Sequence, residues 1–354
     1  MTGKVSPIRV LIVDDSALMR NLLTAVLSED PEIEVVGTAS DPFVARERIK
    51  ALNPDVITLD VEMPRMDGVT FLRKIMSLRP TPVVMVSTLT QAGADVTLQA
   101  LEIGAVDFVA KPTTDIAKAL PELAAEIQAK VKIAARTRVR THNPDAVRKR
   151  PERKRVSDPS AKIVVIGSST GGVEALKALL MDFIPNGPPI LVAQHMPERF
   201  TAAFARRLDR ECPMRVCEAE HGQRVESGIV YIAPGQRHLE LTRDGAHFAC
   251  RITEDPLVSG HRPSVDVLFR SAARVAGPRT IGVILTGMGK DGAEGLLELR
   301  HAQATTLGQD EASSLVYGMP RVAFERGAVM RQIPLSEMAD AILDACGIEV
   351  SAAL

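Results

Sequence analysis

Short apolar runs alternate with amphipathic stretches along the first third of the chain. The runs at 9–13, 56–59 and 82–86 are dominated by Val, Ile, Leu and Met, and the residues between them have helical spacing. Continuous apolar strands separated by helices are typical of a parallel sheet that is covered on both faces. The pattern therefore predicts an α/β domain.

The alternation stops between residues 134 and 160. This window contains nine Lys and Arg residues, three acidic residues and three prolines, and almost no large apolar side chain. Such a segment cannot bury enough surface to fold alone, so we expect a flexible basic linker at 134–160. The boundaries that follow are a first domain at 1–133 and a second domain at 161–354.

The strand pattern starts again after this window. Apolar runs at 162–166, 190–193 and 280–285 predict buried strands, and a region between the last two has the Gly and Pro punctuation of hairpins. A length of 354 residues also fits two domains of about 150 residues each. We therefore expect two doubly wound parallel-sheet α/β domains joined by a linker.

Composition narrows the class of protein. Apolar residues make up 45% of the chain, and 43 Lys and Arg against 44 Asp and Glu leave it nearly neutral, which is typical of a soluble globular protein. No apolar run reaches the roughly 18 to 20 residues of a membrane helix, and the N-terminus lacks a signal-type core. We expect no membrane insertion and a cytoplasmic location. The scattered cysteines, Cys212, Cys217, Cys250 and Cys346, form no metal-type pair.

Polar residues follow the predicted strands of the first domain. In open α/β sheets ligands bind outside the carboxyl ends of the strands, so these residues are expected to meet at one rim. They are Asp14, Asp15, Asp60, Ser87 and Lys111. Three neighbouring carboxylates repel one another, and a hard divalent cation such as Mg²⁺ relieves that repulsion. The lysine and the hydroxyl could hold the oxygens of a phosphoryl group, with Asp60 as the nucleophile, although a single Asp after a strand is often only a helix cap.

These residues carry a family resemblance. VDDS at 13–16, DVEMPRMDG at 60–68, Ser87 and the Lys111-Pro112 pair resemble a two-component receiver domain over about residues 8–130. The resemblance implies a flavodoxin-like fold in which Asp60 is phosphorylated by a histidine kinase. It also implies that Asp15, Asp60 and the backbone carbonyl of Glu62 hold Mg²⁺.

The same resemblance assigns four supporting roles around Asp60. Asp14 supports the metal site, and Lys111 supports the phosphorylation site. Ser87 follows the phosphoryl group, and Phe108 occupies the place of the switch aromatic. Because phosphorylation adds roughly 1.5 to 2 negative charges, it can pull on Ser87 and reorganise the adjacent face. This domain is therefore expected to be an input switch.

The first strand of the second domain runs into the glycine-rich turn GSSTGG at 167–172, which is followed by a helical pattern. The turn satisfies G-x-S-x-G with Ser169 as an exposed nucleophile, but it also fits an anion-binding loop or a simple tight turn. A serine nucleophile needs a base, and His195 is the one of seven histidines that directly follows a predicted buried strand. Asp291, after the strand at 280–285, is the candidate to orient His195, unless it only caps the next helix.

The order Ser, His, Asp differs from that of the α/β-hydrolases. Together with the motifs of this half, it resembles the catalytic domain of chemotaxis protein-glutamate methylesterases of the CheB type over about residues 161–345. The motifs are GSSTGG, QHMP at 194–197, HRPSVDVLF at 261–269, ILTGMGKDG at 284–292 and EASSLVYGMP at 311–320. The resemblance implies a Rossmann-like three-layer α/β/α domain.

The chemistry implied by the resemblance is hydrolysis of γ-glutamyl methyl esters on chemoreceptors, with release of methanol and without a cofactor for the esterase step. Ser169 is then the nucleophile, His195 the general base and acid, and Asp291 the residue that holds the tautomer of His195. The backbone amide of Met288 is the oxyanion donor. Deamidation of receptor glutamines is also implied. We further expect a monomer in which the unphosphorylated receiver covers the mouth of the Ser169 site.

Two other functions are weighed against this one. GSSTGG could bind a nucleotide without hydrolysis, but the turn lacks the GxGxxG spacing of a dinucleotide site. The basic linker could contact DNA, but residues 161–354 show no helix-turn-helix signal and the linker lacks aromatic residues. We therefore expect no nucleic-acid partner.

Overall fold

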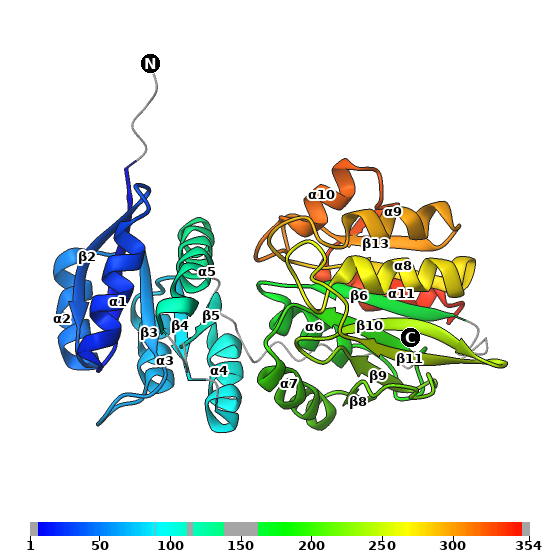
Figure 1. Cartoon of the computed structure of the whole chain (residues 1–354), viewed down its shortest axis with the longest axis horizontal. Helices are drawn as coiled ribbons and strands as arrows, with labels where there is room; N and C mark the ends of the chain where they lie inside the picture. Colours follow the sequence, from blue (N-terminus) through cyan, green and yellow to red (C-terminus); the bar gives the residue numbers. More distant parts are fainter. Residues whose placement is uncertain (1–5, 89, 112–115, 138–161, 349–354) are drawn as a thin grey trace, which may run out of the picture. The chain divides into compact units, whose positions relative to one another are not determined.

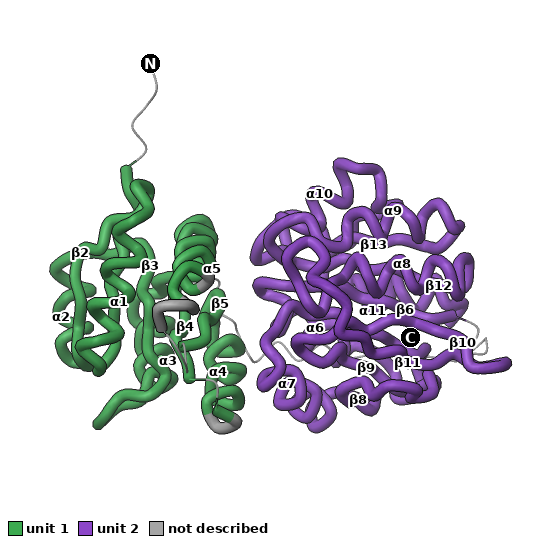
Figure 2. The backbone as a smooth tube through the Cα atoms, in the orientation of Figure 1, with its two compact units in different colours: residues 1–146 green, residues 147–354 purple. Residues whose placement is uncertain are grey.

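The computed structural model describes residues 6–88, 90–111, 116–137 and 162–348 (Figure 1). The chain divides into two compact units, Met1–Ala146 and Val147–Leu354 (Figure 2). Each unit is an α/β structure with its own parallel sheet. Among the described residues, every helix is too short or too polar to cross a bilayer.

The first unit has a five-stranded sheet in the order β2-β1-β3-β4-β5, and all of its strand pairs are parallel. This is the flavodoxin-like order, so the predicted fold is confirmed. The elements are β1 (Ile8–Val13), α1 (Ala17–Ser28), β2 (Ile33–Ala39), α2 (Pro42–Leu52), β3 (Val56–Asp60), α3 (Gly68–Leu78), β4 (Val83–Ser87), α4 (Gln91–Ile103), β5 (Asp107–Ala110) and α5 (Ile116–Arg136).

One face of this sheet is covered by α1 and α5, whose apolar residues share a core with β1 and β4. Leu23 and Leu27 of α1 and Ile127 of α5 are among its buried members. Short polar side chains start the helices: the Ser16 hydroxyl accepts from Met19 N–H, and the Asp67 carboxylate accepts from Thr70 N–H. These caps hold the loops after β1 and β3 in place.

Helix α5 continues to Arg136, beyond the expected start of the linker at 134. The physical reason is packing, because Ala134 is fully buried in the core beneath α1. The basic character that suggested a linker begins only with the last turn of this helix. Residues 138–161, and so most of the predicted linker, lie outside the described residues. The domain boundaries therefore remain a prediction.

The second unit has a seven-stranded sheet in the order β14-β13-β12-β6-β7-β9-β8, again with parallel pairs throughout. An antiparallel hairpin, β10 and β11, lies outside this sheet. The elements are β6 (Ile163–Ser168), α6 (Gly172–Met181), β7 (Ile190–Gln194), α7 (Glu198–Glu211), β8 (Arg215–Glu218), β9 (Ile229–Ile232), β10 (His238–Asp244), β11 (His247–Thr253), α8 (Val265–Val275), η2 (Gly277–Arg279), β12 (Thr280–Ile284), α9 (Ala293–His301), β13 (Thr305–Gln309), α10 (Met319–Glu325), β14 (Arg331–Ile333) and α11 (Leu335–Ala345).

Three layers form this unit, as predicted. Helices α8, α9 and α10 share one core with the β10–β11 hairpin and with residues of β6 and β7. Helix α6 contacts both α7 and α11, and these three form the other cover of the sheet (Figure 1). The fold class expected from the sequence is therefore confirmed for both units.

The chain changes direction at β6, which lies between β12 and β7. It moves from β6 to β7 on one side and returns later to β12 on the other, so a crevice opens at the carboxyl ends of these strands. The loops after β6, β7 and β12 carry Ser169, His195 and Asp291. The topology thus brings the three loops of the predicted catalytic residues to one edge.

Two glycines let the start of α8 approach this edge. A Cβ on Gly167 would lie 2.1 Å from Cγ1 of Val265, and a Cβ on Gly292 would lie 2.5 Å from the same atom. Val265 is the first residue of α8 and is fully buried. The absence of side chains at both positions therefore sets how closely α8 can pack against β6 and β12.

We predict that Gly167→Ala lowers the free energy of unfolding of the second unit by about 1 to 3 kcal/mol, because the new methyl overlaps Val265. The measurement is the urea midpoint of the full chain. The double variant Gly167→Ala/Val265→Ala should lose less than the sum of the two single variants, since shortening Val265 makes room. Additive losses would show that the contact with Val265 is not the cause.

Candidate functional site

Three carboxylates meet at the carboxyl edge of the first sheet. Asp14 and Asp15 follow β1 and Asp60 ends β3, and each offers an oxygen within 4.8 Å of the others. Asp14 and Asp60 are buried, whereas Asp15 is exposed. The structure therefore brings together the two carboxylates predicted to hold the metal, Asp15 and Asp60, and the predicted supporting residue Asp14.

Lys111 supplies a positive charge at this cluster. Its Nζ lies 3.0 Å from Asp14 Oδ2 and 2.8 Å from Asp60 Oδ2. One ammonium group cannot balance three carboxylates. Burial raises the pKa of Asp60 to about 6, and the charge of Asp14 also raises it, while Lys111 and the Glu62 amide lower it. An all-oxygen donor set with excess negative charge fits a divalent cation such as Mg²⁺.

Ser87 and Phe108 lie on the neighbouring strands. The Ser87 hydroxyl accepts a hydrogen bond of 2.7 Å from Thr97 Oγ1, so the structure ties Ser87 to α4 and not to Asp60. Phe108 is 5% exposed, and the Lys130 ammonium lies 5.1 Å from the centroid of its ring. Phe108 lies on β5 at the position predicted for the switch aromatic. Its ring therefore contacts α5 through Lys130.

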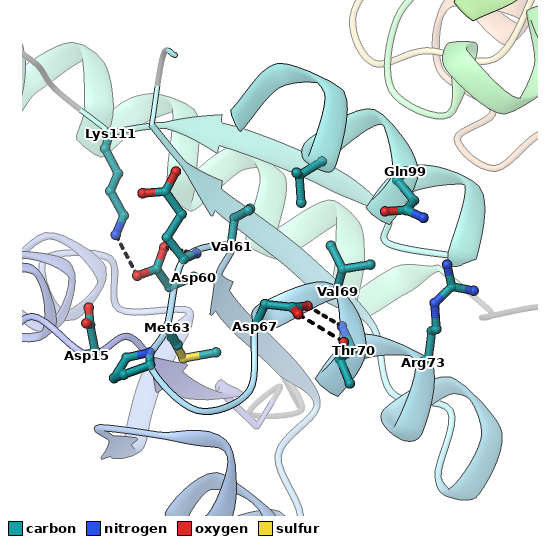
Figure 3. A pocket seen from close by; sticks show the side chains of 13 residues that line it. Asp15, Asp60, Val61, Met63, Asp67, Val69, Thr70, Arg73, Gln99 and Lys111 are labelled. Atoms are coloured by element: carbon teal, nitrogen blue, oxygen red, sulfur yellow. Dashed lines mark hydrogen bonds and ion pairs between the residues drawn. The ribbon is translucent and has the colours of Figure 1, made fainter. Parts of the chain in front are cut away.

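A pocket of about 860 Å³ opens beside Asp60. Figure 3 shows Asp15 and Lys111 on either side of Asp60, with Arg73 and Gln99 toward the other end of the pocket. Glu62 also lines this pocket, and its amide donates to Asp60 Oδ1 over 3.2 Å. Asp15 and Asp60 of the acidic cluster therefore line an open pocket. Pro112 lies outside the described residues.

In the second unit, the GSSTGG turn joins β6 to α6. Ser169 N–H donates to Thr286 O over 3.0 Å, and Ser169 O accepts from Gly172 N–H over 2.7 Å. Gly171 has φ +78, a left-handed conformation that favours glycine, and α6 begins at the next residue. The half-buried hydroxyl of Ser169 makes no hydrogen bond with the described part of the chain.

His195 follows β7 directly, and its Nε2 lies 2.8 Å from Asp291 Oδ2. Its side chain is 9% exposed, and that of Asp291 is 1% exposed. An ionised Asp291 requires the ring proton to lie on Nε2, which leaves a lone pair on Nδ1. Nδ1 is buried and has no partner among the described residues. The predicted His–Asp contact is therefore present, but the ring makes no hydrogen bond to the Ser169 hydroxyl.

Asp291 caps a helix, but not the helix that follows it in the chain. Its carboxylate accepts from Val265 N–H over 2.7 Å and from Asp266 N–H over 3.1 Å, both at the N-terminus of α8. The Ser264 hydroxyl donates to Oδ1 over 2.8 Å. Burial alone would raise the pKa of Asp291, but the hydrogen bond and charge of His195, the Val265 amide and Ser264 together hold it below its usual value.

Sequence reasoning missed two residues that support this pair. Ser264 lies within the HRPS part of a family motif, but the motif does not predict its contact with Asp291, which joins separate elements. The ring of His261 stacks on His195 with centroids 3.7 Å apart and planes 13° apart. His261 follows no apolar strand, so the strand pattern does not select it. A motif signal was present for both residues, but their contacts depend on where the loop before α8 folds.

The loop after β12 passes closely over Ser169. A Cβ on Gly287 would lie 2.8 Å from Ser169 Cβ, so only glycine allows this approach. Thr286 holds the loop, because its hydroxyl donates to Thr170 O over 3.0 Å and accepts from Val316 N–H over 2.9 Å. Met288, which follows Gly287, is 42% exposed. Its amide N–H has no hydrogen-bond partner within the described residues.

Comparison with known proteins adds two family matches. Residues 10–120 match the response regulator receiver domain, and residues 164–342 match the CheB methylesterase family. The crystal structure of the Thermotoga maritima CheB methylesterase catalytic domain is 38% identical in sequence and superposes with a TM-score of 0.51. The match covers 52% of this chain and 97% of that domain.

Two curated relatives match nearly the whole chain. Protein-glutamate methylesterase/protein-glutamine glutaminase 1 of Caulobacter vibrioides is 61% identical, over 95% of this chain and 97% of the relative. The protein of the same name from Geobacter metallireducens is 55% identical, over 94% of each chain. The fold and the two sites define a response regulator whose receiver is followed by a hydrolase-type α/β unit. The chain belongs to the CheB methylesterase family, which confirms the resemblance seen in its motifs.

The lowered pKa of Asp291 predicts how stability depends on pH. A carboxyl with a lower pKa in the folded state contributes stability above its ordinary pKa of 3.8, and this contribution is lost as the pH falls through the folded-state value. We expect Asp291→Asn to be destabilising at pH 7, and the difference from the wild type to shrink on acidification below about pH 4.

The measurement is the urea midpoint of both proteins at pH 7, 5 and 3.5. Asp244→Asn is the control, because this exposed hairpin residue has no partner among the described side chains. A difference that stays constant with pH would contradict the assignment of an ionised, hydrogen-bonded Asp291.

Proposed function

We propose that this chain removes methyl groups from glutamate methyl esters of chemoreceptors and deamidates specific receptor glutamines. We further propose that phosphorylation of the receiver unit activates this hydrolysis during sensory adaptation in chemotaxis. The observation that carries the proposal is the buried pair of His195 and Asp291 at 2.8 Å, placed beside the Ser169 turn at the switch point of the sheet. Membership of the CheB methylesterase family supports the substrate class.

In the proposed reaction, Ser169 Oγ attacks the ester carbonyl and its proton moves to His195 Nδ1. This nitrogen is the available base because Nε2 is held by Asp291. The imidazolium that forms is stabilised by the ionised Asp291, and it returns the proton to the methoxide that leaves as methanol. Water then attacks the acyl-serine by the same proton route and releases glutamate. For a glutamine side chain, the leaving group is ammonia.

The oxyanion formed in each step requires hydrogen-bond donors at the Ser169 turn. We assign the amide of Met288 as one donor, because it follows Gly287, which lies directly over Ser169. Two contacts of Thr286 hold this loop in place. Its hydroxyl donates to Thr170 O, and its N–H donates to Gln309 Oε1 over 2.8 Å. A loop held in this way needs little reorganisation when charge develops.

In the receiver unit, we propose Asp60 as the phosphoacceptor and a histidine kinase as the phosphodonor. Asp15, Asp60 and the Glu62 carbonyl would hold Mg²⁺, with Asp14 supporting the metal site. Mg²⁺ supplies charge neutralisation for the phosphoryl oxygens. Lys111 holds a phosphoryl oxygen, and Ser87 leaves its contact with Thr97 to donate to another. Phe108, on β5, would be the aromatic residue of the switch that responds to phosphorylation of Asp60.

The remaining assignments follow the same proposal. The chain acts as a cytoplasmic monomer in which a receiver domain that includes all of α5, to Arg136, is tethered to a catalytic domain at 161–354. The unphosphorylated receiver reduces access to Ser169, and phosphorylation of Asp60 relieves this. Such control requires a free-energy difference between two states that the phosphoryl group changes.

We predict that Ser169→Ala lowers the rate of methanol release from methyl-esterified receptor membranes by at least about 10³-fold, because the nucleophile is lost. His195→Ala should lower it by a similar factor. The control is Ser227→Ala, a change of the same kind on the turn before β9. Substantial methanol release by folded Ser169→Ala protein would exclude Ser169 as the nucleophile.

We predict that Asp15→Asn weakens Mg²⁺ binding by about tenfold or more, since it removes a carboxylate ligand from the cluster. The measurement is calorimetric titration of the full chain with MgCl₂. The control is Asp67→Asn, because Asp67 lines the same pocket but caps α3. Equal Mg²⁺ affinities for these two variants would contradict the proposed ligand set.

The switch is tested by comparing the wild type with Asp60→Asn in the assay of methanol release. A small acyl phosphate with Mg²⁺ should raise methanol release by the wild type and leave Asp60→Asn at its basal rate. Stimulation of Asp60→Asn equal to that of the wild type would place the switch elsewhere.

A further inference from the structure

Gln194, the last residue of β7, lies between the two loops that carry Ser169 and His195. It is 3% exposed, and its amide makes three hydrogen bonds. Nε2 donates to Ser169 O and to His195 O, each over 3.0 Å. Oε1 accepts from the Ser168 hydroxyl over 2.6 Å.

The orientation of this amide is set by its partners. The two backbone oxygens can only accept hydrogen bonds, so the NH₂ group must face them and the carbonyl oxygen must face Ser168. Both N–H donors of Gln194 are therefore used, one for each loop. A single planar group, itself almost fully buried, thus fixes the separation between the backbone of Ser169 and that of His195.

The surrounding backbone leaves space for this group. A Cβ on Gly172 would lie 2.0 Å from Gln194 Oε1, so any larger residue there would displace the amide. The Ser169 carbonyl also accepts from Gly172 N–H, and His195 N–H donates to Ser168 O over 3.1 Å. The two loops are therefore joined at several points, and within the described residues the side chain of Gln194 is hydrogen-bonded to the backbone of both reacting residues.

This connection matters because the Ser169 hydroxyl and His195 Nδ1 share no hydrogen bond in the structure. Their alignment has to come from the backbones that carry them. Asp291 holds the ring of His195 from the other side, through Nε2. A small change in the separation of nucleophile and base lowers the rate strongly, since proton transfer depends on reach and angle.

We propose that Gln194 is a positioning residue that sets the nucleophile and the general base of the hydrolase at their working separation. The inference rests on the proposed roles of Ser169 and His195. It predicts that loss of the two Nε2 donors slows the chemical step while leaving substrate binding and the fold in place.

The test uses the full chain and methyl-esterified receptor membranes. Gln194→Met keeps the length of the side chain but removes its donors. We expect kcat to fall by about 30- to 100-fold with KM changed by less than about threefold. Gln223→Met is the matched control, because Gln223 lies outside the site and should keep the wild-type kcat. A raised KM at unchanged kcat would overturn the proposal.

Ser168→Ala should lower kcat by less than Gln194→Met does. It removes the partner of Oε1 but leaves both Nε2 donors, so we expect a smaller loss of kcat, below about tenfold. If Gln194→Met does not fold, as judged by circular dichroism and its urea midpoint, Gly172→Ala displaces the same amide from its other side. Wild-type kcat in a folded Gly172→Ala protein would also overturn the proposal.

A double-variant cycle separates positioning from a general structural role. If Gln194 acts by aligning His195 with Ser169, Gln194→Met should cost less than about threefold when His195 is already Ala. The readout is the rate at which a fluorophosphonate labels Ser169, which is measurable at low reactivity. Independent, multiplicative losses would mean that Gln194 does not act through His195.

The outcomes also separate this inference from the function on which it rests. An active Ser169→Ala protein would contradict the proposed roles of Ser169 as nucleophile and His195 as its base. An inactive Ser169→Ala protein together with a fully active Gln194→Met protein would leave those roles standing and overturn the inference about Gln194 alone.

Discussion

The second unit depends on one buried carboxylate, that of Asp291. It accepts hydrogen bonds from the first amides of α8, from the Ser264 hydroxyl and from the ring of His195. A buried charge of this kind is tolerated only when it is fully hydrogen-bonded, so the start of α8 and the loop after β7 must both meet it. The same group therefore joins the start of α8 to the loop after β7 and holds the ring of His195 through its Nε2.

The two units use buried carboxylates with opposite electrostatic outcomes. Asp60 has one nearby ammonium group, a second buried carboxylate and one backbone donor, and its pKa is raised to about 6. Asp291 has several donors and a histidine, and its pKa lies below the usual value. The carboxylates around Asp60 therefore carry more negative charge than Lys111 balances, whereas the charge of Asp291 is met by its hydrogen-bond donors and by His195. This contrast fits a switch in one unit and a preset catalytic pair in the other.

Much of the site follows from one rule about parallel sheets. Because functional side chains gather at the carboxyl ends of strands, the residues after the apolar runs point to Asp60 and Lys111 and to the pair of His195 and Asp291. Ser264 and His261 do not follow apolar runs, so the rule does not predict them as site residues. Asp291 is a helix cap as well as the partner of His195, but it caps α8 from across the unit, which spacing along the chain cannot reveal.

The sequence by itself determined the parallel α/β class of both units, the ends of their most apolar strands and the motifs that mark a receiver and a methylesterase, because burial on both faces leaves a clear local pattern. Tertiary structure decided the contacts that join separate loops. The amide of Gln194 contacts Ser169 and His195, and Ser87 is tied to Thr97 instead of Asp60. Which partner a polar side chain selects depends on the positions of elements far apart in the chain, and no local periodicity encodes those positions.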